Sequence, residues 1–403
     1  MKKIFGLAAV SLCLLLGISA AASGVTVEVQ GGYSCDYGVD IPFTPSARTN
    51  RYTFALYAGG NAAGSPEVTA EVTIASAGTV HLPLKYDLTG PSDWTLAVTA
   101  HLLPGREAFD REAMAAKVFT TAPTCGCPAG TAGAFYAGKG IAGSPFLVAS
   151  SQQLRHIEAH LSAHYKQVGH IDCGGANWAP IGKGYRNVAA TAFTGVYDGD
   201  GYTISNLNIS GTSMATGLFS TAAGATFQNL GLKHFSVYCN RSSSECGDSA
   251  ALVGATFGGT KIVRCWVADT SIVSANDNSG GLSGFSDGTE IIEDCYTLRL
   301  SCQGWYGYGI GYNSQSIKNC YAVSSYNNRA FTGGIAINTD YSAIQNCYWL
   351  KGPTQAALSG TSVSCQALDS ESAFQTGNPF SGWSSSVWRF TAGEFPKLAV
   401  EKS

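Results

Sequence analysis

Short runs in which apolar and polar residues alternate fill the first quarter of the chain. They include Val25–Val29, Tyr52–Leu56, Val68–Ile74 and Trp94–Val98, and turns rich in glycine, proline and asparagine separate them. Alternation with a period of two predicts strands that bury one face. We therefore expect a small β-sandwich over residues 24–124, of the immunoglobulin or fibronectin type.

After these runs, the spacing of apolar residues predicts a helix, roughly from Ser151 to Tyr165. Ser150 or Ser151 can cap this helix, and its apolar residues share one face. These apolar residues are Leu154, Ile157, Leu161 and Tyr165. The glycine-rich stretch before the helix, residues 125–143, predicts a linker, and strand patterns continue after it.

A repeat with a spacing of roughly 23 to 35 residues runs from about residue 195 to 350. Each copy carries a short unit in which an apolar residue, a corner residue, a buried residue and an aromatic residue recur in order. The copies are Ile262–Trp266, Ile292–Tyr296, Ile317–Tyr321 and Ile344–Tyr348, with Phe227–Gly231 in the same frame. Units this short cannot bury a core alone and must stack on their neighbours, so we expect a β-solenoid.

The residue types in one unit predict where each side chain points. The isoleucine faces inward, and the asparagine that often follows occupies a left-handed corner, which asparagine tolerates well. The cysteine then faces inward as a small apolar group, and the aromatic residue faces outward. Coils stacked about 4.8 Å apart align equivalent positions, so Arg264 should face Asp294, and Glu293 should face Lys318. The inward thiols are Cys265, Cys295, Cys320 and Cys347.

Several ordered blocks resemble the GLUG-repeat family of exported bacterial and archaeal proteins. The opening blocks are Gly143–Val148, Ile171–Asp172, Trp178–Gly182 and Phe193–Ile204, and the segment from Asn346 to Leu398 resembles the family's closing segment. The resemblance implies a right-handed parallel β-helix over residues 144–403 and an adhesin-like or accessory role without catalytic residues. A similar segment precedes the protease in IgA-cleaving metallopeptidases. The expected fold class is thus all-β: an N-terminal β-sandwich, then a right-handed parallel β-helix with a short capping α-helix.

Composition narrows the classes of partner. Charged residues make up 13% of the chain, hydrophobic residues 45%, and the formal net charge is −3. This hydrophobic content excludes a disordered chain, and the lack of basic excess argues against nucleic acid as a partner. Two lysines, an apolar run over Ile4–Ile18 and small residues predict a signal peptide over residues 1–22. We expect a secreted or cell-surface protein with no membrane span after cleavage.

Three histidines, His156, His160 and His164, follow one another at intervals of four in the expected helix. Such spacing allows a metal clamp. The zinc-protease signature requires His-Glu-x-x-His, however, and Glu158 is one place off. We therefore interpret the histidines as the polar flank of a capping helix.

Asp198 and Asp200, in an Asp-Gly-Asp-Gly sequence, suggest a calcium loop. The downstream bidentate glutamate of a helix-loop-helix calcium site is absent, so we interpret the segment as a turn between coils and expect no cofactor. Cys239 and Cys246 lie in a serine-rich insertion and are expected to form a loop-closing disulfide.

Outward aromatic residues are the main functional candidates. They comprise a column of Trp266, Tyr296, Tyr321 and Tyr348, and a glycine-rich group of Trp305, Tyr306, Tyr308 and Tyr312. Exposed aromatic faces suit sugar rings or an apolar partner surface, so we expect binding to an extracellular glycan or surface protein. Alternatively, the C-terminal segment or neighbouring loops cover the column. No catalytic constellation occurs, so an enzyme is not expected; a polysaccharide lyase or hydrolase, and a structural spacer or assembly subunit, remain the competing function classes.

Overall fold

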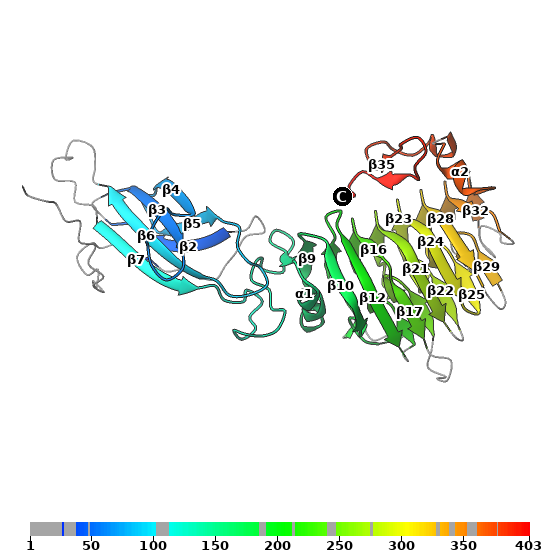
Figure 1. Cartoon of the computed structure of the whole chain (residues 1–403), viewed down its shortest axis with the longest axis horizontal. Helices are drawn as coiled ribbons and strands as arrows, with labels where there is room; N and C mark the ends of the chain where they lie inside the picture. The colour runs from blue at the N-terminus through cyan, green and yellow to red at the C-terminus, as the bar shows by residue number, and fades with distance from the viewer. Residues whose placement is uncertain are drawn as a thin grey trace, which may run out of the picture. The chain divides into compact units, whose positions relative to one another are not determined.

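The fold is taken from a computed structural model of the whole chain (Figure 1). The structure describes residues 26–27, 38–46, 49–101, 113–184, 191–211, 214–239, 247–274, 277–327, 331–337, 343–352, 361–376 and 378–403. The predicted signal peptide and Cys246 lie outside the described residues. The chain divides into two compact units, one mostly within residues 39–120 and the other mostly within residues 121–403.

The first unit contains two β-sheets. One sheet has the order β1-β2-β5 and the other the antiparallel order β4-β3-β6-β7. The strands are β1 (Thr26–Val27), β2 (Gly38–Thr44), β3 (Arg51–Ala58), β4 (Val68–Thr73), β5 (Gly78–Pro83), β6 (Asp93–His101) and β7 (Ala113–Thr120). Alternate residues of β3, among them Tyr52 and Phe54, are buried, and both rings meet Phe43 of β2 edge-on. This period-two burial is the pattern that predicted the strands.

The second unit is a coil of parallel strands, in which equivalent strands of successive turns lie side by side (Figure 1). Its first sheet contains β8 (Phe146–Val148), β9 (His164–Gln167), β11 (Val196–Asp198), β15 (Thr226–Gln228), β20 (Lys261–Val263), β23 (Ile291–Glu293), β27 (Ser316–Lys318), β31 (Ala343–Gln345) and β33 (Thr361–Val363). The second sheet contains β10 (Ile171–Trp178), β12 (Thr203–Gly211), β16 (Gly231–Lys233), β17 (Ser236–Cys239), β21 (Trp266–Ser274), β24 (Tyr296–Gln303), β28 (Tyr321–Tyr326), β32 (Tyr348–Leu350) and β34 (Gln366–Leu368).

A third sheet completes most turns of the coil. It contains β13 (Ala215–Thr216), β18 (Asp248–Ala250), β22 (Asn278–Gly280), β25 (Tyr306–Tyr308) and β29 (Phe331–Gly333). Two short parallel pairs follow it: β14 (Phe219–Ala223) with β19 (Val253–Phe257), and β26 (Gly311–Tyr312) with β30 (Ala336–Ile337). The all-β fold with a parallel β-helix, predicted from the repeat, is confirmed.

The corner between the first and second sheets follows the predicted geometry. The corner residues have φ between 51° and 58°, in the left-handed region. They are Asn206, Asn229, Arg264, Asp294, Asn319, Asn346 and Ser364. The cysteines that follow these corners, from Cys265 to Cys347, are buried. Ser364 and Cys365 add one more copy of the unit, which sequence analysis left unassigned.

The predicted register is confirmed for both charged pairs, but the side chains of Arg264 and Asp294 turn to other partners. Glu293 pairs with Lys318 on neighbouring strands. Arg264 instead turns its guanidinium toward Asn229, with 2.7 Å between Nε and Oδ1. Asp294 accepts hydrogen bonds from Asn319 and from a tryptophan of the C-terminal segment, so its carboxylate is used elsewhere.

The capping helix is shorter than predicted. Helix α1 spans Ser151–His156, a 3₁₀ turn η2 spans Ile157–Ala159, and the chain then enters β9 at His164. Ser150 is the N-cap, and its hydroxyl accepts a hydrogen bond from the Gln153 N–H. The prediction of a helix to Tyr165 is wrong because Tyr165 pairs with Tyr197 of β11, and strand pairing in the first coil outweighs the helical period.

The predicted linker over residues 125–143 is packed rather than extended. Phe135 is fully buried and stacks on Phe146 of β8, with ring centroids 4.7 Å apart. Gly133 and Gly138 have positive φ, and a Cβ on either would collide with backbone of residues 152 or 145. The glycines therefore permit close approach to the first coil, so the linker prediction is wrong for this segment.

The C-terminal segment, residues 371–403, runs back along the second sheet (Figure 1). It contains α2 (Glu371–Phe374), a 3₁₀ turn η4 (Asn378–Phe380), and the antiparallel pair β35 (Trp388–Arg389) and β36 (Lys397–Leu398). Near its end, the backbone of Lys402 donates to the Gly201 carbonyl at 2.9 Å. We call this segment the tail.

Candidate functional site

The predicted aromatic column forms, but it is buried. Its members face one another in register on β21, β24, β28 and β32. The Tyr296 and Tyr321 rings are stacked, with centroids 4.9 Å apart and an interplanar angle of 2°. Trp266, Tyr296 and Tyr321 are each at most 4% exposed, and Tyr348 is half-buried. The prediction of an accessible column is therefore wrong for the first three residues.

The tail supplies the cover. Its apolar residues pack on the column as one cluster: Phe374, Phe380, Trp383, Trp388 and Leu398. The hydroxyls are also engaged, because Tyr321 donates to the Pro396 carbonyl at 2.7 Å and Tyr296 donates to the Glu401 carboxylate at 3.0 Å. The column is thus the inner half of a second hydrophobic core.

The glycine-rich aromatic group divides between surface and core. Trp305 is 44% exposed and Tyr306 is partly exposed, whereas Tyr308 is fully buried and donates its hydroxyl hydrogen to the Gly284 carbonyl. Tyr308 is therefore removed from the candidate binding residues. On the next coil, Phe331 is 45% exposed and stacks on Tyr306, with centroids 5.7 Å apart and planes 10° apart. We call Trp305, Tyr306 and Phe331 the aromatic patch.

Tyr312 belongs to another ladder, on the short strands after the third sheet. Its ring stacks on Phe285 at 5.8 Å, and Phe285 lies 6.0 Å from Phe257 on the preceding coil. All three rings are partly exposed. Sequence analysis missed Phe331, Phe285 and Phe257 because they lie outside the recurring unit, although each has an aromatic residue one coil away.

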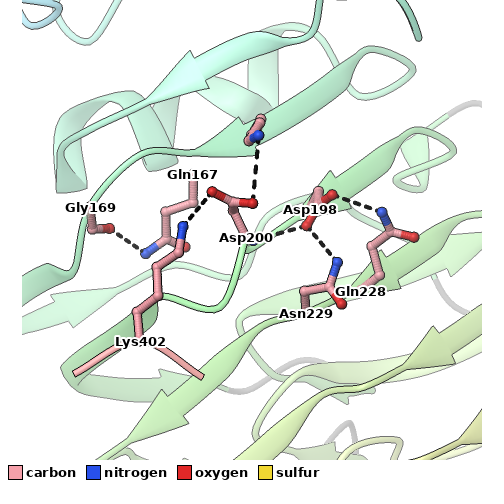
Figure 2. A network of polar contacts seen from close by, with 8 residues as sticks. Gln167, Gly169, Asp198, Asp200, Gln228, Asn229 and Lys402 are labelled. Atoms are coloured by element: carbon pink, nitrogen blue, oxygen red, sulfur yellow. Dashed lines mark hydrogen bonds and ion pairs between the residues drawn. The ribbon is translucent and has the colours of Figure 1, made fainter. Parts of the chain in front are cut away.

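The carboxylates of the suggested calcium loop are held by the protein itself (Figure 2). Asp198 accepts hydrogen bonds from the Gln228 and Asn229 amides at 2.8 and 2.9 Å. Asp200 pairs with Lys402 of the tail at 2.6 Å and with Lys166 at 3.5 Å. Two ammonium groups beside Asp200 disfavour a cation there, so these contacts argue for a structural corner rather than a calcium site.

A groove of about 470 Å³ lies along the first coils of the first sheet. His164, Lys166, Asp198 and Gln228 contribute to its lining. His164 thus lies on a strand beside this groove, and its side chain is not part of the histidine grouping that the helical spacing predicted.

His156 and His160 remain neighbours, and two cysteines join them. The Nε2 atom of His156 lies 3.3 Å from the Sγ atom of Cys127 and 3.7 Å from that of Cys125. The Nε2 atom of His160 lies 3.4 Å from the Cys127 sulfur. All four potential ligand atoms lie within 4.8 Å of one another. We call these four residues the Cys–His cluster.

The surroundings of the Cys–His cluster are apolar on one side. Phe135 lies 5.5 Å from the His156 ring and 6.3 Å from the His160 ring. Burial lowers the pKa of both histidines, and the neighbouring His160 lowers that of His156 further. The lowered pKa values favour the neutral imidazole, in which one ring nitrogen carries a lone pair.

Whether a cysteine is a free thiol or disulfide-bonded depends on where it lies in the β-helix. Cys265, Cys295, Cys320 and Cys347 are buried free thiols, and burial raises the pKa of Cys265 and Cys320 well above the ordinary value. Cys239 is disulfide-bonded. Its pairing with Cys246 stays a prediction because Cys246 lies outside the described residues.

Comparisons with known proteins give one partial likeness. The chain is 32% identical over 165 residues to halomucin of Haloquadratum walsbyi, which covers 38% of this chain and 2% of halomucin. No family model and no solved structure matches, so the resemblance to the GLUG-repeat family stays a prediction. Within the part of the chain described here, no helix has the length and apolar character needed to cross a membrane. The described geometry thus offers two candidate sites, the aromatic patch and the Cys–His cluster.

Proposed function

We propose that this protein is exported and acts outside the cell or at its surface as an adhesin-like protein that binds glycan through the aromatic patch. The observation that carries the proposal is the accessibility of aromatic side chains on adjacent coils of the β-helix. Trp305 and Phe331 each expose more than two fifths of their surface, although most large apolar side chains of the unit are buried. Exposed aromatic groups at one place on a coil commonly serve binding.

The exposed rings of the aromatic patch favour a saccharide as the ligand, because sugars present apolar C–H faces that lie flat against aromatic rings. The polar neighbours Asn278 and Ser279 are buried beneath the patch, and Ser279 donates its hydroxyl hydrogen to the Tyr306 carbonyl at 3.0 Å. These two residues therefore support the backbone of the patch and do not line its surface.

The location outside the cell is supported by several observations. The sequence begins with a pattern typical of a secretory leader, and the likeness to a segment of halomucin is compatible with an extracellular role. The formal net charge of −3 leaves no excess of basic residues, which argues against nucleic acid as a partner.

A glycan array with the full chain tests this proposal. We expect Trp305→Ala and Phe331→Ala each to weaken binding about tenfold, equivalent to about 1.4 kcal/mol. Tyr238→Ala is the matched control, because Tyr238 is also 45% exposed but lies on β17 of the second sheet. The control should bind as the wild type does, and circular dichroism should show an unchanged fold in all three variants.

Two results would reject glycan binding at the aromatic patch. One is equal loss of signal in Tyr238→Ala and in the two patch variants. The other is no signal with the wild type across neutral and acidic glycans, which would favour the spacer or assembly role. New reducing or unsaturated ends after incubation with acidic polysaccharides would instead indicate the enzyme class.

A further inference from the structure

We propose that Cys125, Cys127, His156 and His160 bind one zinc ion, which fastens the segment before the β-helix to its capping helix. The cluster lies wholly within the second unit of the chain. Two residues come from a turn at the start of this unit, one from the end of α1 and one from just after η2. The four donors therefore converge from two segments that are about thirty residues apart in sequence.

The distances match a tetrahedral ion. Zinc lies about 2.3 Å from a cysteine sulfur and about 2.05 Å from a histidine nitrogen, so tetrahedral geometry separates sulfur from nitrogen by about 3.6 Å. Three of the four sulfur–nitrogen distances in the cluster are 3.3, 3.4 and 3.7 Å, and the fourth is within 4.8 Å. All four donor atoms therefore lie close enough together to surround a single ion.

The types of donor atom in the Cys–His cluster indicate which metal it would bind. Two sulfurs and two imidazole nitrogens suit zinc, whereas calcium and magnesium take oxygen ligands. Four protein donors also complete the coordination sphere of zinc and leave no position for a substrate. The geometry therefore corresponds to a structural site and not to a hydrolytic one.

The backbone is shaped to present these donors. Gly126, between the two cysteines, has a φ of 79°, and this left-handed conformation suits a tight turn that places both thiols on one side. The turn is anchored because the Thr124 N–H donates to the Phe135 carbonyl at 2.7 Å. His160 has a φ of −141° and leaves the helical conformation, so its ring stays near His156 while the chain turns into β9.

The zinc ion would explain how a glycine-rich segment stays packed. Residues 125–134 contain no large apolar side chain, and the first one after them, Phe135, is fully buried. Metal ligation would hold the turn against α1 without requiring a larger core. The first coil and the segment that covers it would then unfold together.

Metal content of the full chain, expressed without a polyhistidine tag and purified under reducing conditions with zinc, tests this proposal. We expect about one zinc per chain, falling below about 0.2 in Cys127→Ser and in His160→Gln. The matched control is His164→Gln, which should retain the metal because His164 lies on β9 outside the cluster. X-ray absorption should show two sulfur and two nitrogen neighbours, and cobalt substitution should give the visible bands of tetrahedral thiolate ligation.

A variant that misfolds would also lose zinc. The X-ray absorption and cobalt spectra of the wild-type protein identify the ligands without relying on any variant. The proposal is overturned by a wild-type chain that takes up no zinc, or by an absorption spectrum without sulfur neighbours. It is equally overturned by zinc that persists in His160→Gln and disappears in His164→Gln, or by a Cys125–Cys127 disulfide in the reduced, zinc-supplied protein.

Discussion

Replacing Trp388 by alanine should remove the main contact between the tail and the aromatic column. Trp388 is 1% exposed, and its ring lies 4.4 Å from Trp383 and about equally far, 6.0 and 6.2 Å, from Tyr321 and Tyr296. Its indole N–H donates to the Asp294 carboxylate at 3.2 Å. One side chain thus joins the tail to two adjacent coils of the second sheet.

The magnitude follows from burial and from the cavity that truncation leaves. Large buried aromatic residues cost about 3–5 kcal/mol when cut to alanine. Asp294 keeps its hydrogen bond from Asn319, so the lost indole contact adds little. Phe390 is the matched control, because it lies on the same tail but is 36% exposed, and Phe390→Ala should cost about 1 kcal/mol.

Urea unfolding followed by near-ultraviolet circular dichroism measures this effect, because buried aromatic rings such as those of the column contribute to that signal. Acrylamide quenching of tryptophan fluorescence then reports whether Trp266 becomes accessible. We expect Trp388→Ala to lower the unfolding midpoint well below that of Phe390→Ala and to increase quenching. Equal midpoints for the two variants, with unchanged quenching, would refute the assignment of the tail as the cover of the column.

Three further outcomes follow from single positions in the coil. Asn319 has a φ of 52°, so Asn319→Val should destabilise the protein by about 1–2 kcal/mol more than Asn319→Gly does, and equal melting temperatures would contradict this. Burial raises the pKa of the Glu290 carboxyl from 4.5 to about 7, although a hydrogen bond from Ser314 opposes this shift. Because the folded protein favours the protonated carboxyl, its contribution to the free energy of unfolding is fully present below pH 4.5 and is lost as the pH rises through 7. Glu290→Gln should abolish this loss, on the order of 3 kcal/mol, and be more stable than wild type at pH 8 by urea titration; an unchanged pH profile would refute it. The Cys320 thiol should resist a thiol reagent in the folded protein and react after unfolding, which mass spectrometry of labelled peptides would measure.

The β-helix could be predicted because every copy of the repeat satisfies the same local constraints. A corner such as Asn319 requires a residue that tolerates positive φ, and the following Cys320 requires a small buried group. Both constraints act within a few residues and recur on each coil. The corner was therefore predicted correctly even where Arg264 or Asp294 replaces asparagine.

Cover of the aromatic column by the C-terminal segment was stated as an alternative and is confirmed, but the repeat could not decide between it and an accessible column. The tail lies on Tyr296 and Tyr321 through contacts between residues that are far apart in sequence, and no period links the two segments. The packing of Phe135 was missed because the glycines around it, read locally, indicate flexibility. The same glycines give close approach once a partner surface exists.

The Cys–His cluster was missed for a related reason. The helical spacing of the histidines drew attention to His164, whereas the strand pairing of Tyr165 removes that residue from the helix. Cys125 and Cys127, which precede the helix, were not considered together with the histidines. A Cys-x-Cys pair about thirty residues before a His-x-x-x-His pair was the available signal for the cluster.

Burial on both faces separates the structural aromatic residues from those available for binding. In β21, β24 and β28 the residue after each aromatic is also buried, so these strands have a core on both faces: the coil interior on one and the tail on the other. In β25 and β29 the strand begins with a partly exposed ring, Tyr306 or Phe331, and ends at a buried residue. Aromatic residues of the column therefore contribute to cohesion, because their removal leaves a cavity, whereas those of the aromatic patch can be replaced with little loss of packing. This difference predicts that patch variants keep the fold while losing binding, and column variants lose both together.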